Sequence, residues 1–83
     1  MKMKKTIHSK EYRKLIGLLR EKRESLEITQ RKLASMIDTD QTFISKIENS
    51  ERRIDVIELR TICKALKISF TDFVIELEKH LEK

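Results

Sequence analysis

Apolar residues recur along this 83-residue chain at intervals of three and four, the spacing that places them on one face of an α-helix. The first stripe predicts a helix that begins after an N-cap at Ser9 and ends at about Ser25. Two apolar residues, Leu26 and Ile28, are expected to plug the turn that follows. The inward positions of this helix are Tyr12, Leu15, Ile16 and Leu19.

Two short helical patterns follow between residues 29 and 49, with very little chain between them. Thr29 is the expected N-cap of the first, and Asp40 is the expected N-cap of the second. The connector, Asp38–Asp40, is too short for the two helices to pack antiparallel, so they must cross sharply. This crossing is the geometry of a helix-turn-helix. The apolar residues that hold the pair together are Leu33, Ala34, Ile37, Ile44 and Ile47.

The last third of the chain predicts two further helices. Asp55 with Glu58 three residues later is typical of a capping box. Ser69 with Asp72 gives a similar signal for a final helix over residues 69–83. The expected buried stripe of the fourth helix is Val56, Leu59, Ile62, Cys63 and Leu66. The apolar stripe of the fifth is Phe70, Phe73, Val74, Leu77 and Leu81.

Five predicted helices and no strand give an all-α fold class, a single compact domain over residues 9–83. Residues 1–8 are basic and lack periodicity, so we expect a flexible arm there. The single cysteine excludes an intrachain disulfide. No apolar run is long enough to span a membrane, and the basic start leads into no hydrophobic segment of a signal peptide. We therefore expect a cytoplasmic protein of bacterial or phage origin.

The net charge of +5 is concentrated in the part of the chain that holds the helix pair. Residues 1–53 contain 14 basic and 8 acidic residues, whereas residues 54–83 contain 5 and 6. A basic surface alone is weak evidence, because many small proteins use one for solubility. The outward positions of the second short helix add amides, hydroxyls and a cation, which can read base edges and bind phosphates. They are Gln41, Thr42, Ser45, Lys46 and Asn49. This segment therefore predicts binding to double-stranded DNA.

Several short segments occur together at a consistent spacing: Thr29-Gln30, Leu33-Ala34, Ile44–Asn49, Asp55-Val56 and Ala65–Ser69. With them, residues 11–74 closely resemble the phage-repressor-like helix-turn-helix family, also called the Xre or Cro/repressor type. The resemblance implies a repressor-like DNA-binding domain in which the second and third helices form the helix-turn-helix.

The resemblance further implies that residues 40–49 form the recognition helix and lie in the major groove. Gln41, Thr42 and Lys46 would then read bases, with the Gln41 amide able to form two hydrogen bonds to an adenine edge. For Phe43 two readings stay open: partial packing on the core, or contact with the sugar-phosphate backbone and a thymine methyl. The implied contacts to the DNA backbone are Gln30, Phe43, Ser45, Asn49, Arg52 and Arg53.

The resemblance also implies a largely buried ion pair between Arg23 and Glu48, which would make Glu48 structural although it lies in the recognition helix. Four positions depart from the family pattern. They are Glu27 and Asp38 in place of Gly, Thr39 in place of an apolar residue, and Ile54 in place of Pro. Asp tolerates a left-handed backbone better than most residues, so the turn at Asp38 is still expected to form.

The remaining reactive side chains have ordinary structural interpretations. Cys63 and Tyr12 lie on apolar stripes and are expected in the core, and the two histidines, His8 and His80, are expected on the surface. The sequence contains no nucleophile–base pair, no glycine-rich phosphate loop and no set of metal ligands at a suitable spacing. We therefore predict no enzymatic activity, no metal and no cofactor.

Apolar residues on the fifth helix exceed what a core of this size needs, so a partner is expected to cover some of them. The resemblance implies a homodimer through the fourth and fifth helices, and the alternative is a monomer whose last helix closes the core. A two-fold dimer would place two recognition helices about one DNA turn apart, on an inverted repeat. The candidates for the interface are Phe73, Ile75, Leu77 and Leu81.

These features together predict a small transcriptional regulator, a repressor or a controller protein, with no small-molecule effector. One alternative is an antitoxin that masks a toxin through the fifth helix, with DNA binding as a secondary activity. The other is a helical scaffold with no role on nucleic acid.

Overall fold

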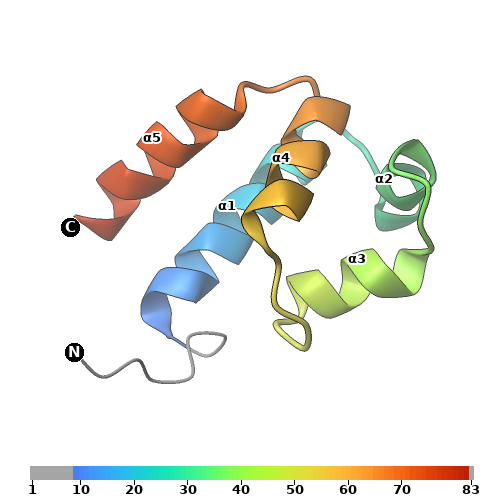
Figure 1. Ribbon diagram of the computed structural model, residues 1–83, viewed down its shortest axis with the longest axis horizontal. Coiled ribbons are helices and arrows are strands. Elements are labelled where there is room, and N and C mark those ends of the chain that lie inside the picture. The colour runs from blue at the N-terminus through green and yellow to red at the C-terminus, as the bar shows by residue number, and fades with distance from the viewer. Residues whose placement is uncertain (1–8, 83) are drawn as a thin grey trace.

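The computed structural model describes residues 9–82, which fold into five helices and contain no strand (Figure 1). The predicted all-α fold class is confirmed. The predicted basic arm, residues 1–8, lies outside the described residues. Within residues 9–82, no helix is long and apolar enough to cross a membrane. The helices are α1 (Lys10–Ser25), α2 (Gln30–Met36), α3 (Gln41–Glu48), α4 (Val56–Ala65) and α5 (Phe70–Leu81).

Every helix begins at a side chain that caps its first turn. In each case the oxygen of the N-cap side chain accepts a hydrogen bond from the backbone amide three residues later, at 2.7–3.1 Å. At α4 the Glu58 carboxylate also accepts from the Asp55 amide at 3.0 Å, which completes the predicted capping box. The five N-caps are those predicted from the sequence: Ser9, Thr29, Asp40, Asp55 and Ser69.

Each of the helices α1 to α4 is followed, two positions after its last residue, by a residue in the left-handed backbone conformation, with φ of 58–59°. The amide of this residue donates to the carbonyl three residues back, and the next amide donates to the carbonyl five residues back. This pair of hydrogen bonds satisfies the last carbonyls of each helix and is the Schellman motif. The position favours glycine, because other residues pay roughly 1–2 kcal/mol there. Here the four residues are Glu27, Asp38, Ser50 and Lys67.

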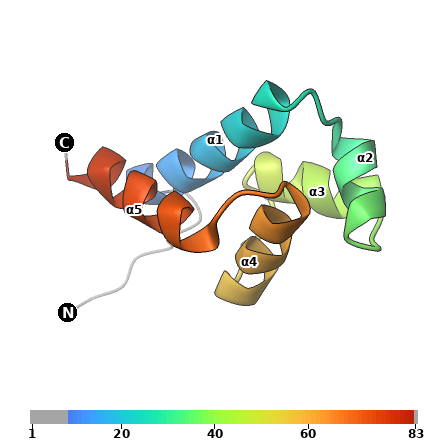
Figure 2. The same ribbon diagram turned by 90° about the horizontal axis from the view of Figure 1, so that it is seen from above.

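Two pairs of helices lie at opposite ends of the domain and share one core. At one end α5 packs beside α1, and at the other α2 packs on α3 (Figures 1 and 2). Helix α4 lies between them and contacts both α2 and α5, while α1 also contacts α3. This arrangement places the predicted recognition helix α3 at the opposite end of the long axis from α5.

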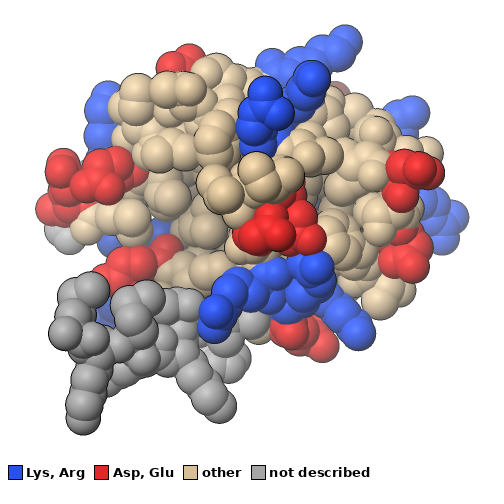
Figure 3. Space-filling model, in the orientation of Figure 1, with Lys and Arg blue, Asp and Glu red and all other residues tan. Residues whose placement is uncertain are grey.

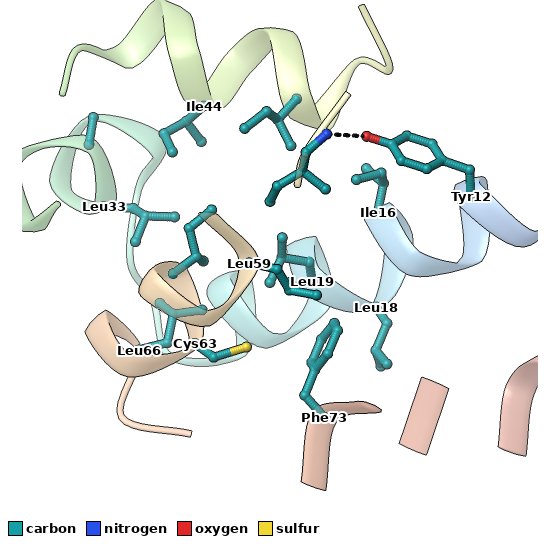
Figure 4. Close-up of a cluster of buried hydrophobic side chains, with 14 residues drawn as sticks. Tyr12, Ile16, Leu18, Leu19, Leu33, Ile44, Leu59, Cys63, Leu66 and Phe73 are labelled. Carbon is teal, nitrogen blue, oxygen red and sulfur yellow. Dashed lines mark hydrogen bonds between the residues drawn. The ribbon is translucent and has the colours of Figure 1, made fainter. Parts of the chain in front are cut away.

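The core draws side chains from all five helices (Figure 4). The predicted core residues Tyr12 and Cys63 are both buried, and burial raises the pKa of the Cys63 thiol to about 11. The Tyr12 hydroxyl accepts a hydrogen bond from the Ile54 amide at 3.0 Å, which ties α1 to the loop before α4. The buried apolar residues are Tyr12, Ile16, Leu18, Leu19, Leu33, Ala34, Ile44, Ile47, Ile54, Leu59, Ile62, Cys63, Leu66 and Phe73.

Three apolar positions differ from the sequence prediction. Val56 is 61% exposed, because it is the first residue of α4 and that turn extends past the core. Leu26 was expected to fill the turn after α1, but it is 47% exposed. It is the C-cap of α1, and only Ile28 of this turn packs on the core. Conversely, Leu18 lies off the predicted stripe but is buried beside Phe73, because α5 packs on that side of α1 (Figure 4).

The residues with a left-handed backbone conformation after the helices predict a gain in stability on substitution by glycine. Lys67→Gly should raise the free energy of unfolding by about 0.5–1 kcal/mol, because relief of the backbone conformation outweighs the added freedom of the unfolded chain. Urea denaturation followed by circular dichroism measures the change. Lys64→Gly is the matched control: it removes the same charge inside α4 and should lower stability by about 1 kcal/mol. A loss of stability in both variants would contradict the assignment.

Candidate nucleic-acid interface

Helix α3 buries one face and exposes the other. Ile44 and Ile47 are each 1% exposed and hold the helix on the core. The opposite face, together with one residue of the loop that follows the helix, lines a shallow concave surface that we call the α3 surface. It consists of Gln41, Thr42, Ser45, Lys46 and Glu51. All three predicted base-reading residues, Gln41, Thr42 and Lys46, therefore lie together and are exposed.

Arg23 of α1 and Glu48 of α3 form a buried, bidentate ion pair beneath this surface. The guanidinium Nε lies 2.7 Å from Glu48 Oε2, and Nη2 lies 2.9 Å from Oε1. The two side chains are only 7% and 4% exposed. Hydrogen bonding to Glu48 raises the pKa of Arg23 despite the opposing effect of burial, so Arg23 stays charged. A third bond, from Nη1 to the Ile28 carbonyl at 2.7 Å, extends the anchor to the loop before α2.

A relay of hydrogen bonds connects this buried pair to the exposed face. Gln30 Nε2 donates to Glu48 Oε1 at 2.9 Å, and Gln41 Nε2 donates to Gln30 Oε1 at 3.4 Å. Because an ionised carboxylate only accepts hydrogen bonds, Glu48 determines which end of the Gln30 amide faces inward. The Gln30 oxygen must then face Gln41. The relay thus leaves the Gln41 carbonyl oxygen and one of its N–H groups for another partner.

The role of Glu48 in this relay is absent from the sequence prediction, which assigns it only to the ion pair. The spacing between residues 30 and 48 contains no signal for the contact, since the two residues lie on different helices. A signal exists only in the chemistry: an amide near a buried carboxylate is a natural donor to its remaining lone pairs.

Phe43 is half-buried on α3 and packs against the core. Its ring is also covered by Arg52, whose guanidinium carbon lies 4.5 Å from the ring centroid. Phe43 therefore packs partly on the core, and its contact with the DNA backbone stays a prediction. The stack with Arg52 is a contact between a cation and an aromatic face that joins α3 to the loop after it, and the sequence spacing did not predict it.

The remaining predicted backbone contacts lie around the C-terminal end of α3. Asn49 is the C-cap, and its Nδ2 donates to Ser45 Oγ at 3.4 Å. Arg53 is exposed, whereas Arg52 forms a bidentate pair with Glu58 at 2.9 Å for both bonds. Figure 3 shows basic side chains gathered where the loop between α3 and α4 runs, with acidic side chains directly above them in this view.

Other kinds of site find little support in the part of the chain that the structure describes. No group of three or more His, Cys, Asp and Glu side chains there is arranged to hold a metal ion. His80 is exposed on α5, with its Nε2 3.9 Å from Glu76, while His8 lies outside the described residues. Cys63 is completely buried, so its thiol is not presented to a substrate.

Comparisons with known proteins point in the same direction as the geometry. Residues 19–73 match the model of the HTH_3 family, described as helix-turn-helix. Over 58 residues the chain is 31% identical to control protein C.MunI from Mycoplasma sp. The matched region covers 70% of this chain and 78% of that protein.

Solved structures are also similar over nearly the whole chain. An XRE-family like protein from Pseudomonas syringae pv. tomato str. DC3000 is 41% identical, with a TM-score of 0.84, over 92% of this chain and 93% of that one. The restriction-modification controller protein C.Esp1396I, solved as a tetramer in complex with its natural 35 base-pair operator, is 30% identical with a TM-score of 0.81. That match covers 92% of this chain and 100% of the other.

The buried ion pair predicts an asymmetric response to substitution. Glu48→Ala should lower the free energy of unfolding by about 3–5 kcal/mol, because Arg23 is left charged and without its partner. The double variant Arg23→Met/Glu48→Leu should lose less than Glu48→Ala alone, because no unpaired charge remains. Chemical denaturation measures both values.

Glu24→Ala is the control for this experiment. Glu24 pairs with Arg20 at 3.2 Å on the surface, where both side chains are more than half exposed, and it lies only at the edge of the buried pair, 3.8 Å from Arg23. Exposed pairs of this kind typically contribute about 0.2–1 kcal/mol. If Glu48→Ala cost no more than Glu24→Ala, the buried pair would not be the anchor between α1 and α3.

Proposed function

The chain belongs to the XRE-type HTH_3 helix-turn-helix family and is a DNA-binding transcriptional regulator, and we propose that it reads an inverted repeat as a homodimer through the major groove. The observation that carries this proposal is the relay from Glu48 through Gln30 to Gln41, because it orients a base-reading amide on an exposed surface. The likeness to C.MunI and C.Esp1396I supports the class of restriction-modification controllers.

Gln41 is the proposed reader of an adenine. One N–H of its amide is directed to Gln30, so the carbonyl oxygen and the second N–H can together bond adenine N6 and N7. Thr42 and Lys46, exposed on the same surface, are the proposed contacts to neighbouring bases. A lysine there can donate to guanine O6 or N7.

The DNA backbone is the proposed partner of the residues around this centre. Gln30 begins α2 and adjoins Gln41, so its amide lies at the rim of the α3 surface. Ser45, Asn49 and Arg53 surround the other end of α3. Contacts of this kind position a protein on the duplex without specifying sequence.

A second copy of the chain is the proposed partner for exposed apolar residues on α4 and α5. Phe73 must be removed from the predicted interface, because it is 2% exposed and fills the core of its own protomer. Leu77 and Leu81 are half-buried, and Ile75 is 50% exposed. The exposed apolar residues of these helices are Val56, Ile57, Val74 and Ile75. The toxin-masking alternative has no comparable support, since two of the relatives described above are control or controller proteins.

Removal of the Gln41 amide tests the reading of bases. A preferred duplex is first selected from a random pool with the wild-type protein. Gln41→Ala should then lose about 1–3 kcal/mol of discrimination at one base pair, while its affinity for unrelated DNA stays nearly unchanged. Arg53→Ala should instead weaken binding to all sequences and flatten the salt dependence by about one unit of slope. An equal loss for every sequence in both variants would reject the assignment of Gln41.

A charge placed on α5 tests the homodimer. Ile75→Asp should yield a folded monomer with reduced affinity for the inverted repeat, because burial of a carboxylate at an apolar interface is unfavourable. Analytical ultracentrifugation and titration of the selected duplex measure the two effects. Thr71→Asp places the same charge at an exposed polar position of α5 and should leave the dimer intact. A wild-type protein that is monomeric at micromolar concentration would contradict the proposal.

A further inference from the structure

The guanidinium of Arg52 is held by a carboxylate that the DNA-binding role does not require. Nη1 and Nη2 of Arg52 each lie 2.9 Å from an oxygen of Glu58, and Nη1 also donates to the Arg53 carbonyl at 2.9 Å. Hydrogen bonding to Arg52 is the main cause that lowers the pKa of Glu58, so Glu58 is ionised at neutral pH. The pair links the loop after α3 to the first turn of α4.

This pair lies beside the recognition helix and is open to solvent. The Arg52 guanidinium covers the ring of Phe43 on α3, and its side chain is 41% exposed against 26% for Glu58. Arginine binds carboxylates and phosphates in the same way, through two parallel N–H groups. A phosphate that binds Arg52 through Nη1 and Nη2 in this way must therefore replace Glu58.

Glu58 can release Arg52 without leaving its helix unsatisfied. Its Oε1 also accepts from the Asp55 amide at 3.0 Å, and its own amide donates to Asp55 Oδ1 at 2.7 Å. These two bonds form the capping box of α4 and do not involve Arg52. A glutamine at this position can form the same capping box.

We propose that Glu58 is an intramolecular competitor of DNA phosphate for Arg52, and that it thereby limits the affinity of the protein for DNA of any sequence. The inference rests on the proposed function, since it requires Arg52 to lie against the DNA backbone. Ion pairs as exposed as this one are weak enough to be exchanged. Glu58 therefore restrains Arg52 without excluding it from the DNA.

The test compares Glu58→Gln with wild type on a mixed-sequence duplex several helical turns long, where backbone contacts dominate. Glu58→Gln should bind about two- to fivefold more tightly, the range expected for release of an exposed pair, and with a steeper dependence on salt. Thermal melting by circular dichroism checks that the variant is folded.

Two further variants separate release of Arg52 from a general change of charge. Glu51→Gln removes one negative charge from the α3 surface itself, so its gain in affinity measures the general effect. The gain from Glu58→Gln should exceed that from Glu51→Gln. In an Arg52→Gln background the excess should disappear, because no guanidinium remains to be released.

Each other outcome overturns the inference. A lower affinity of Glu58→Gln would mean that Glu58 positions Arg52 for DNA, and equal gains in the two glutamine variants would mean that only net charge matters. Failure of the proposed function is distinguishable: the wild-type protein would then bind no duplex even at about 50 mM salt, where contacts to phosphates are strong.

Discussion

The buried ion pair between Arg23 and Glu48 is the interaction on which the arrangement of the helix-turn-helix depends. A charge removed from water is costly unless a partner of opposite sign and further hydrogen bonds compensate it. Here two parallel bonds join the guanidinium to the carboxylate, and a third joins it to the Ile28 carbonyl. Because Arg23 lies in the last turn of α1 and Glu48 ends α3, the pair determines where α3 lies against α1.

The same carboxylate orients the exposed side of the motif. Glu48 Oε1 accepts from both Arg23 and Gln30, and Gln30 in turn accepts from Gln41. The stability of the domain and the direction of its surface amide therefore depend on one acidic residue. This also explains how a helix proposed to face a polyanion can contain a glutamate: the carboxylate points inward and its charge is compensated.

Formal charge overstates how much positive surface is available to a ligand. Arg23 is paired inside the domain, Arg52 is paired with Glu58 beside α3, and Arg20 pairs with Glu24 on α1. Such pairs contribute to the geometry of the domain more than to its external field, because each nearly cancels at a distance. The excess of basic residues before residue 54 is consistent with DNA binding, but their partners determine which of them can bind phosphate.

The sequence by itself determined the elements and which face of α3 is exposed. Caps such as Ser9 and Asp40 bond to amides three residues away, and the apolar stripe of Ile44 and Ile47 leaves only one face of α3 for solvent. These are local relationships, in which sequence spacing fixes spatial distance. The turn at Asp38 was predicted for the same reason, because its backbone conformation depends on the residue itself and Asp tolerates a left-handed backbone.

Apart from the Arg23–Glu48 pair, which the family resemblance implied, only the tertiary structure decided which side chains meet across elements. The partner of Arg52, the inward contact of Gln30 and the burial of Phe73 all depend on how separate helices and loops pack. Sequence spacing does not determine those distances, and several partners were chemically reasonable for each group. The exposure of Val56 has the same origin, since a helical stripe specifies a face but not how far the neighbouring helices extend along it.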